Sequence, residues 1–176
     1  NSWSVPTKAD IVRLISFLSN LQWPQEKKHI IVFNEVNHAK EWGGSIDPEQ
    51  YARLLVFTGQ WAHTEMKNYV VLPAALDLAA PNGKQTTEAF TYLEKMLAFD
   101  PQVFDHIDVW NSHSYPNPGF SSSPTRTGKN SLRGYTHELA FIHKHTGREL
   151  QVMITETGWE DNRSVAGLLS SYYAYA

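Results

Sequence analysis

The stretch HIIVFNEVNHAKEWGG, residues 29–44, has a short apolar run directly before an amide and a carboxylate. The run Ile30–Phe33 is rich in β-branched and aromatic residues, and this composition predicts a strand. Its apolar residues are continuous rather than alternating, which is typical of a strand buried on both faces. Asn34 and Glu35 follow at once. Taken alone, the stretch predicts a buried strand with a polar end.

This strand belongs to a series of four units in which a helix follows each strand. Thr7 and Asp47 are predicted to begin helices as N-caps, and Gly147 is predicted to end one. Alternating strands and helices indicate an α/β fold with a parallel sheet covered by helices. The predicted strands are 30–33, 69–72, 107–110 and 150–155, and the predicted helices are 9–21, 48–67, 86–99, 132–145 and one capped by Ser164.

Two parallel architectures are compatible with these units, a doubly wound sheet and a (β/α)8 or TIM barrel. A doubly wound nucleotide-binding fold would carry a glycine-rich turn after its first strand, and the sequence has neither G-x-G-x-x-G nor a P-loop. In a barrel, the catalytic residues lie at the carboxyl ends of several strands. We therefore favour a partial barrel of about four units, with polar strand ends at 34–35, 75–77, 111–115 and 155–159.

Composition limits the classes of partner. The chain has 176 residues, of which 41% are hydrophobic, and these suffice for one domain over residues 1–176. Its 15 basic and 18 acidic residues are mixed and give a net charge of -3, so we expect neither nucleic acid nor a membrane as partner. The absence of cysteine excludes disulfides and thiolate metal sites. A small neutral partner fits this composition better.

Motifs at two strand ends resemble those of a known enzyme family. The motifs are Phe33-Asn34-Glu35 and ITETGW at residues 154–159. They are similar to the catalytic motifs of the retaining (β/α)8 glycoside hydrolases whose acid/base glutamate follows strand four and whose nucleophile ends strand seven. The resemblance covers nearly the whole chain, and it implies that Glu35 is the acid/base and Glu156 the nucleophile. It also implies a secreted enzyme with a carbohydrate substrate.

The resemblance predicts which part of a barrel the chain represents. The chain would run from the third helix of a complete barrel to the seventh helix, and it would lack strands one to three and strand eight. The start, NSWSVPTKAD, lacks both Met and a signal-peptide pattern, so we expect a piece of a longer protein. Half a barrel exposes two strand edges and an apolar interior. We therefore expect the chain to need the remainder of its barrel or to self-associate through these edges.

The chemistry of glycoside cleavage agrees with two glutamates at strand ends. One carboxyl must protonate the leaving oxygen, and a second must act at the anomeric carbon or activate water. Glu35 and Glu156 supply this pair, and rigid strand ends hold such groups more accurately than loops do. The separation of the carboxyls distinguishes retention from inversion, and a sequence does not reveal it. The resemblance implies retention on a β-linked glycan, with the sugar and the linkage left open.

Further polar residues are expected at the same ends of the strands. By the resemblance, Asn34 would hydrogen-bond the sugar hydroxyl next to the reacting carbon, and the alternative is a simple loop cap. Asn111, His113 and Tyr115 alternate along one strand and should share a face. The resemblance gives His113 and Tyr115 positions beside the nucleophile, where the phenol would keep the carboxylate ionised. The alternative is a core histidine and a tyrosine that packs on the loop.

Tryptophan side chains are candidates for contact with the faces of sugar rings. Trp159 follows the predicted nucleophile by three residues, and Trp42 lies in the loop after Glu35, so we expect both to bind substrate. The remaining candidates Trp3, Trp23 and Trp61 fall on helices or helix-side connections, where core packing is the better expectation.

Two other functional classes fit some of these residues. The side chains of Glu35, Asp77, His113 and Glu156 could hold a hard divalent cation in a sugar isomerase or lyase. Against this, no H-x-H pair follows an early strand, and metal binding does not explain TETGW. We therefore expect no metal and no cofactor. The third class is a barrel that binds carbohydrate without cleaving it.

Overall fold

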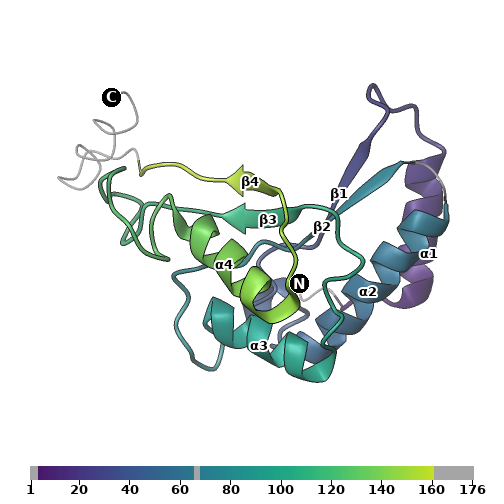
Figure 1. The fold of residues 1–176 in the computed structure, drawn as a ribbon. Coiled ribbons are helices and arrows are strands. Elements are labelled where there is room, and N and C mark those ends of the chain that lie inside the picture. Colours follow the sequence, from purple (N-terminus) through teal and green to yellow (C-terminus); the bar gives the residue numbers. More distant parts are fainter. Residues whose placement is uncertain (1–3, 66–67, 161–176) are drawn as a thin grey trace.

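A computed structural model describes residues 4–65 and 68–160, and its strands and helices alternate along the chain (Figure 1). The predicted helix at Ser164 and the side chain of Trp3 lie outside the described residues. The elements are α1 (Lys8–Ser19), β1 (Lys28–Val32), the 3-10 turn η1 (Ala39–Glu41), α2 (Pro48–Thr64), β2 (Tyr69–Pro73), α3 (Ala89–Phe99), β3 (Trp110–His113), α4 (Gly134–Thr146) and β4 (Val152–Glu156).

The described strands form two parallel pairs. β1 pairs with β2 in the register Lys28↔Tyr69, and β3 pairs with β4 in the register Trp110↔Val152. This confirms the predicted α/β class with parallel strands. The pairs are two-stranded sheets and do not show a closed barrel, which stays a prediction.

β2 and β3 are not joined by a regular ladder of backbone hydrogen bonds, and a side chain makes part of the connection between them. The Asp108 carboxylate accepts a hydrogen bond of 2.7 Å from the Val71 amide, and the Asp108 amide donates one of 2.9 Å to the Val71 carbonyl oxygen. Near the other end of the two strands, Asp77 and His113 form a single parallel bridge. We call this junction the seam between the two pairs. It keeps the strands in chain order, β1 to β4.

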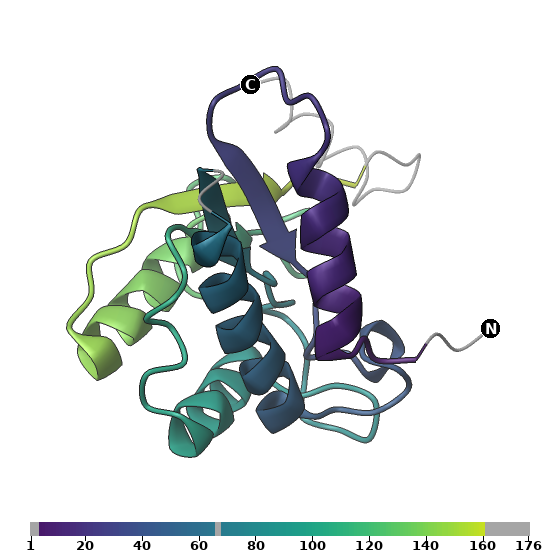
Figure 2. The ribbon, with the colours of Figure 1, turned by 90° about the vertical axis from the view of Figure 1, so that its right-hand side faces the viewer.

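Helices α2, α3 and α4 lie along one side of the strands (Figure 1), and α1 lies beside α2 and β1 (Figure 2). The predicted helix caps at Thr7, Asp47 and Gly147 are confirmed. Thr7 and Asp10 form a reciprocal capping box at α1, and the Asp47 side chain caps α2 directly before Pro48. Gly147 ends α4 with a φ of 71°, a left-handed conformation that glycine adopts at little cost.

Several element boundaries differ from the sequence prediction by two or more residues, and among the element starts those of α3 and β3 differ most. α3 begins at Ala89 rather than Thr86, because the hydroxyl of Thr86 donates to the Pro81 carbonyl oxygen and holds that residue in the loop. β3 begins at Trp110 rather than Ile107. The carbonyl oxygen of Ile107 instead accepts a hydrogen bond of 3.0 Å from the Arg148 guanidinium, which also bonds the Phe104 carbonyl oxygen.

The apolar core lies between the strands and the helices. Its largest fully buried members include Trp110 and Phe104, whose rings meet edge to face at 5.5 Å. Among the apolar side chains of the strands, Ile31 is 47% exposed, and Met153 and Ile154 are also exposed. These exposed side chains are what an incomplete barrel would leave, although the partner that would cover them stays a prediction.

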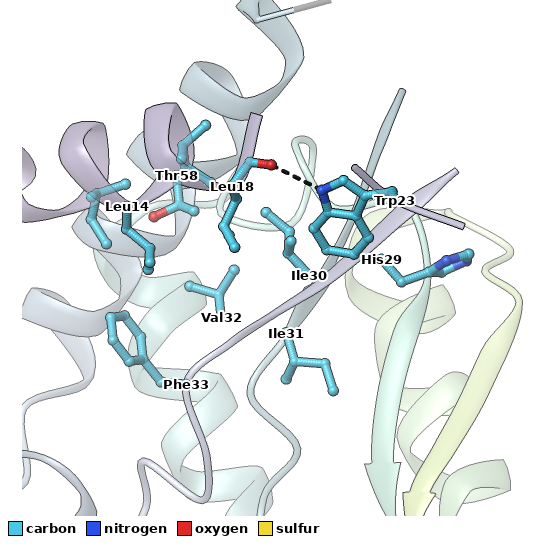
Figure 3. A pocket seen from close by; sticks show the side chains of 11 residues that line it. Leu14, Leu18, Trp23, His29, Ile30, Ile31, Val32, Phe33 and Thr58 are labelled. Carbon is cyan, nitrogen blue, oxygen red and sulfur yellow. Dashed lines mark hydrogen bonds between the residues drawn. The ribbon is translucent and has the colours of Figure 1, made fainter. Parts of the chain in front are cut away.

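An apolar hollow of about 420 Å³ lies between α1 and β1 (Figure 3). Leu14, Leu18 and Val32 line it, and the Trp23 indole N–H donates a hydrogen bond of 2.9 Å to the Leu18 carbonyl oxygen at its edge. Its lining includes no carboxyl group, so the hollow does not offer the pair of carboxyls that glycoside cleavage needs. Trp23 and Trp61 are both partly buried on the helix side, as predicted.

Within residues 4–65 and 68–160, we find no helix with the length and hydropathy that crossing a membrane requires.

We predict that Gly59→Ala destabilises the protein. A β-carbon at this position of α2 would lie 2.4 Å from the His106 carbonyl oxygen, which is closer than atoms can approach. Overpacking of this kind costs about 1–3 kcal/mol, against a gain of about 1 kcal/mol from the better helix propensity of alanine. Urea unfolding measures the difference. Gly83→Ala is the control, since its β-carbon would have no neighbour closer than 3.8 Å. If the Gly59→Ala variant is as stable as the control, the close contact between Gly59 and His106 is contradicted.

Candidate active site

Glu35 lies three residues after β1, in a backbone conformation that is unusual for residues other than glycine. Phe33 has a φ of 75° and Glu35 a φ of 37°. The Glu35 amide donates a hydrogen bond of 3.0 Å to the Ala75 carbonyl oxygen, so the end of β1 is tied to the segment after β2. Strained backbone of this kind persists only where the surroundings hold it, and it occurs often at functional sites. The side chain of Glu35 is 20% exposed.

His113 lies between Glu35 and Glu156. Its Nδ1 is 3.0 Å from Oε1 of Glu35, which is a hydrogen-bond distance, and its Nε2 is 3.6 Å from Oε1 of Glu156. The imidazole is only 3% exposed. One oxygen of each carboxylate lies within 4.8 Å of the other. The strand ends therefore bring together the two glutamates that are 121 positions apart in the sequence.

Tyr115 adds a hydrogen bond to the second glutamate. Its hydroxyl donates to Oε2 of Glu156 at 3.1 Å. Burial raises the pKa of the phenol, and so do its hydrogen bond to Glu156 and the negative charges of Glu156 and Glu35. The phenol therefore stays protonated and remains a donor to the carboxylate.

The position of Glu156 depends on side-chain bonds between β3 and β4. Glu156 is the last residue of β4 and pairs with His113 through a register shift after Ser112. The hydroxyl of Thr155 donates to Oδ1 of the buried Asn111 at 2.7 Å, and that of Thr157 donates to the Ser114 carbonyl oxygen at 2.7 Å. These bonds hold the end of β4 on both sides of Glu156, whose side chain is 46% exposed.

Both glutamates open into one hollow of about 340 Å³ at the carboxyl ends of the strands. His38 and Asp77 form a further pair there, with Nε2 and Oδ2 2.9 Å apart. Sequence reasoning did not assign His38, Lys40, Asn117 or Phe120, because these residues lie in loops. The sequence signal that could have identified His38 was its position only three residues after Glu35. The lining residues are Glu35, His38, Lys40, Asp77, Ala79, Tyr115, Asn117, Phe120 and Glu156.

Buried Asn37 holds the loops around this hollow. Its side-chain amide donates to the carbonyl oxygens of Asp77 and Thr87, both at 3.0 Å, and its Oδ1 accepts from the Asp77 amide at 3.1 Å. The side chain is completely buried. The loop after β1 is therefore bound to the loop after β2, which carries Asp77.

The other predicted substrate contacts differ in accessibility. Asn34 is exposed next to Glu35. Trp159 lines a neighbouring hollow of about 300 Å³, and its indole N–H donates to the Ser122 carbonyl oxygen at 3.0 Å. Trp42 is fully buried, and its ring packs edge to face against Phe33 and Tyr51. The prediction that Trp42 binds substrate is therefore wrong, because its ring is part of the core.

Three of these side chains could also hold a metal ion. Glu35, His113 and Glu156 each offer one ligand atom, and all three atoms lie within 4.8 Å of one another. Two carboxylates and an imidazole suit several divalent cations. Glycoside hydrolysis needs the same two carboxylates without a metal. The chemistry of the cluster therefore suits both a divalent metal site and a pair of glycosidase carboxyls.

A buried carboxyl lies behind the site, between β3 and α4. Oε2 of Glu138 accepts a hydrogen bond of 2.5 Å from the Ser112 hydroxyl, whereas Oε1 and the nearby indole N–H of Trp110 are buried without a hydrogen-bond partner. Burial raises the pKa of Glu138 from 4.5 to about 7, although the hydrogen bond from Ser112 lowers it in part. Sequence reasoning missed this residue, since it lies on a helix facing the sheet.

The sequence was also compared with known protein families. A family model described as glycosyl hydrolase catalytic core matches residues 3–170. The match includes every described strand and all residues that line the hollow. A comparison with curated proteins found nothing that matches this chain.

We predict that Glu138→Gln removes a pH dependence of stability. The folded protein binds the Glu138 proton more tightly than the unfolded chain, so this contribution is complete below pH 4.5 and is lost as the pH rises through 7. The shift corresponds to about 3 kcal/mol. Denaturant unfolding between pH 4.5 and 8 should show this loss in the wild type and not in the variant.

Glu94→Gln is the control for this comparison, because Glu94 is exposed on α3. That variant should follow the wild type at each pH. If Glu138→Gln has the same pH profile as the control, the buried carboxyl does not titrate in this range.

Proposed function

Because the chain belongs to the glycosyl hydrolase catalytic core family and is a glycosidase, we propose that it cleaves a β-linked glycan with retention of configuration. Glu35 acts as the general acid and base, and Glu156 acts as the nucleophile. The observation that supports these roles is the short distance between the two carboxylates, which open into one hollow at the strand ends.

The separation of the carboxylates favours retention over inversion. Retaining enzymes hold the two groups about 5–5.5 Å apart, whereas inverting enzymes leave about 6.5–9.5 Å for a water molecule. One oxygen of Glu35 lies within 4.8 Å of one oxygen of Glu156. Such a gap suits direct attack of a carboxylate on the anomeric carbon, because it leaves little room for water between the groups.

The first step joins the sugar to Glu156. The Glu156 carboxylate attacks the anomeric carbon while Glu35 donates its proton to the leaving oxygen, and a glycosyl ester forms. Tyr115 supports this step, since its hydrogen bond stabilises the ionised form of Glu156. His113 contacts Glu35 directly and keeps it in position.

The second step releases the sugar. Glu35, now ionised, takes a proton from water, and the water oxygen attacks the anomeric carbon and displaces Glu156. Asn34 is proposed to bind the hydroxyl next to the reacting carbon, where a hydrogen bond gains strength in the transition state. Trp159 is proposed to pack against a sugar ring.

A metal-dependent isomerase or lyase is the second candidate, supported by the cluster of Glu35, His113 and Glu156. A chelator distinguishes the two. Activity that survives exhaustive treatment with EDTA supports the glycosidase mechanism, and activity that is lost and then restored by a divalent cation supports the metal enzyme.

We predict that Glu35→Gln and Glu156→Gln each lower kcat by at least about 100-fold, because each variant removes a group that the reaction requires. The measurement uses a panel of aryl β-glycosides and β-linked oligosaccharides. Glu35→Gln should affect substrates with poor leaving groups most, since these depend on protonation. Glu149→Gln is the control at an exposed loop position and should keep wild-type activity.

The anomeric configuration of the first product, followed by proton NMR, tests the mechanism independently. Retention is expected. An initial product with inverted configuration rules out Glu156 as the nucleophile, and wild-type turnover in either glutamate variant removes that residue from the mechanism.

A further inference from the structure

Phe120 is an exposed aromatic residue at the border of two hollows. It is 44% exposed and lies in the long loop between β3 and α4. One hollow contains Glu35 and Glu156, and the other is lined by Thr157 and Trp159. Phe120 and Tyr115 line both hollows, so the two spaces adjoin each other at these rings.

The backbone around Phe120 is held in a specific conformation. Phe120 has a φ of 53°, which is uncommon for a bulky side chain and costs about 1–2 kcal/mol. The Glu160 amide donates to the Phe120 carbonyl oxygen at 2.9 Å, and the Trp159 indole donates to the Ser122 carbonyl oxygen at 3.0 Å. The segment after β4 therefore holds the loop and determines where the Phe120 ring lies.

The Phe120 ring also contacts the catalytic centre through Tyr115. The two ring centroids are 4.9 Å apart and their planes are inclined at 68°. Tyr115 in turn donates its hydrogen bond to Glu156. Phe120 thus packs on Tyr115, the residue that bonds the proposed nucleophile. Its own side chain remains 44% exposed to solvent.

The second hollow has the size and lining of a sugar subsite. Its volume of about 300 Å³ is near the lower end of the range for small-molecule sites, about 300–1,000 Å³. Aromatic rings from two separate segments, Phe120 and Trp159, line it. Flat apolar rings suit the C–H faces of pyranose units, and Glu160 at the same hollow can accept hydrogen bonds from hydroxyl groups.

We propose that Phe120 and Trp159 form a subsite. This subsite binds the sugar unit next to the unit whose glycosidic bond is cleaved. The subsite makes the enzyme select a β-linked oligosaccharide over a single glycoside. This inference rests on the proposed glycosidase function, because it assigns the neighbouring hollow to the same substrate. Phe120 is therefore a determinant of specificity that contacts substrate outside the reacting bond.

We predict that Phe120→Leu lowers the ratio of kcat/KM on a hexasaccharide to kcat/KM on the matching aryl monoglycoside by about 10-fold. Leucine keeps an apolar side chain but has no flat face, and the tenfold change corresponds to the loss of about 1.4 kcal/mol of ring contact. Phe120→Tyr retains the aromatic face and should restore the ratio to within about two-fold of the wild type.

The probes are hexasaccharides of β-1,4-linked glucose, xylose and mannose and of β-1,3-linked glucose, with the corresponding aryl glycosides. Phe17→Leu is the control, since Phe17 is an exposed aromatic on α1, away from the lining of both hollows. An unchanged ratio in Phe120→Leu overturns the subsite. An equal loss on both substrates also overturns it, because Phe120 would then act only by positioning Tyr115.

Binding separates failure of this inference from failure of the proposed function. Titration calorimetry of the same hexasaccharides with Glu156→Gln measures affinity without turnover. A further Phe120→Leu change should raise Kd about 10-fold. If the wild type hydrolyses none of the substrates but Phe120→Leu still weakens hexasaccharide binding, the proposed reaction fails and the subsite stands. If hydrolysis occurs and binding is insensitive to Phe120→Leu, the subsite fails and the reaction stands.

Discussion

The imidazole of His113 lies between the carboxyl groups of Glu35 and Glu156, and the geometry of the site depends on this arrangement. The His113 ring hydrogen-bonds Glu35, and the Tyr115 hydroxyl donates to Glu156. Because both side chains come from the end of β3, this one short strand holds glutamates that belong to different strands. The pair is therefore organised before any substrate is present, as electrostatic catalysis requires.

Much of this arrangement could be predicted from local sequence. The apolar run before Asn34 and Glu35 indicated a strand, and parallel strands bring their carboxyl ends to one edge, so Glu35, His113 and Glu156 were expected to meet. Helix caps were also predictable, because an N-cap such as Asp47 acts on residues only three positions away. The family match agrees with the glycoside hydrolase motifs, whereas the roles of the individual residues remain a proposal.

What could not be predicted depends on contacts between distant segments. Trp42 follows Glu35 closely in sequence, yet its ring enters the core between Phe33 and Tyr51, and no local pattern distinguishes a core ring from a sugar platform. Phe120 was overlooked in a loop rich in serine, proline and glycine, because its position is determined by hydrogen bonds from the segment after β4. β3 began three residues later than its apolar run suggested, since Arg148 from beyond α4 binds the carbonyl oxygen of Ile107. In each case a tertiary contact overrode a local preference.

The seam between β2 and β3 has a consequence for how the molecule moves. Glu35 belongs to the pair β1 and β2, and Glu156 belongs to the pair β3 and β4, so the gap between the two carboxylates spans the boundary between independently hydrogen-bonded sheets. The contacts that join these sheets include the hydrogen bond from the Val71 amide to the Asp108 carboxylate and the bridge between Asp77 and His113. Sub-global opening starts where backbone pairing is sparse. Because backbone pairing between the two sheets is sparse, we expect a glycan that lies across both of them to stabilise the fold as it binds.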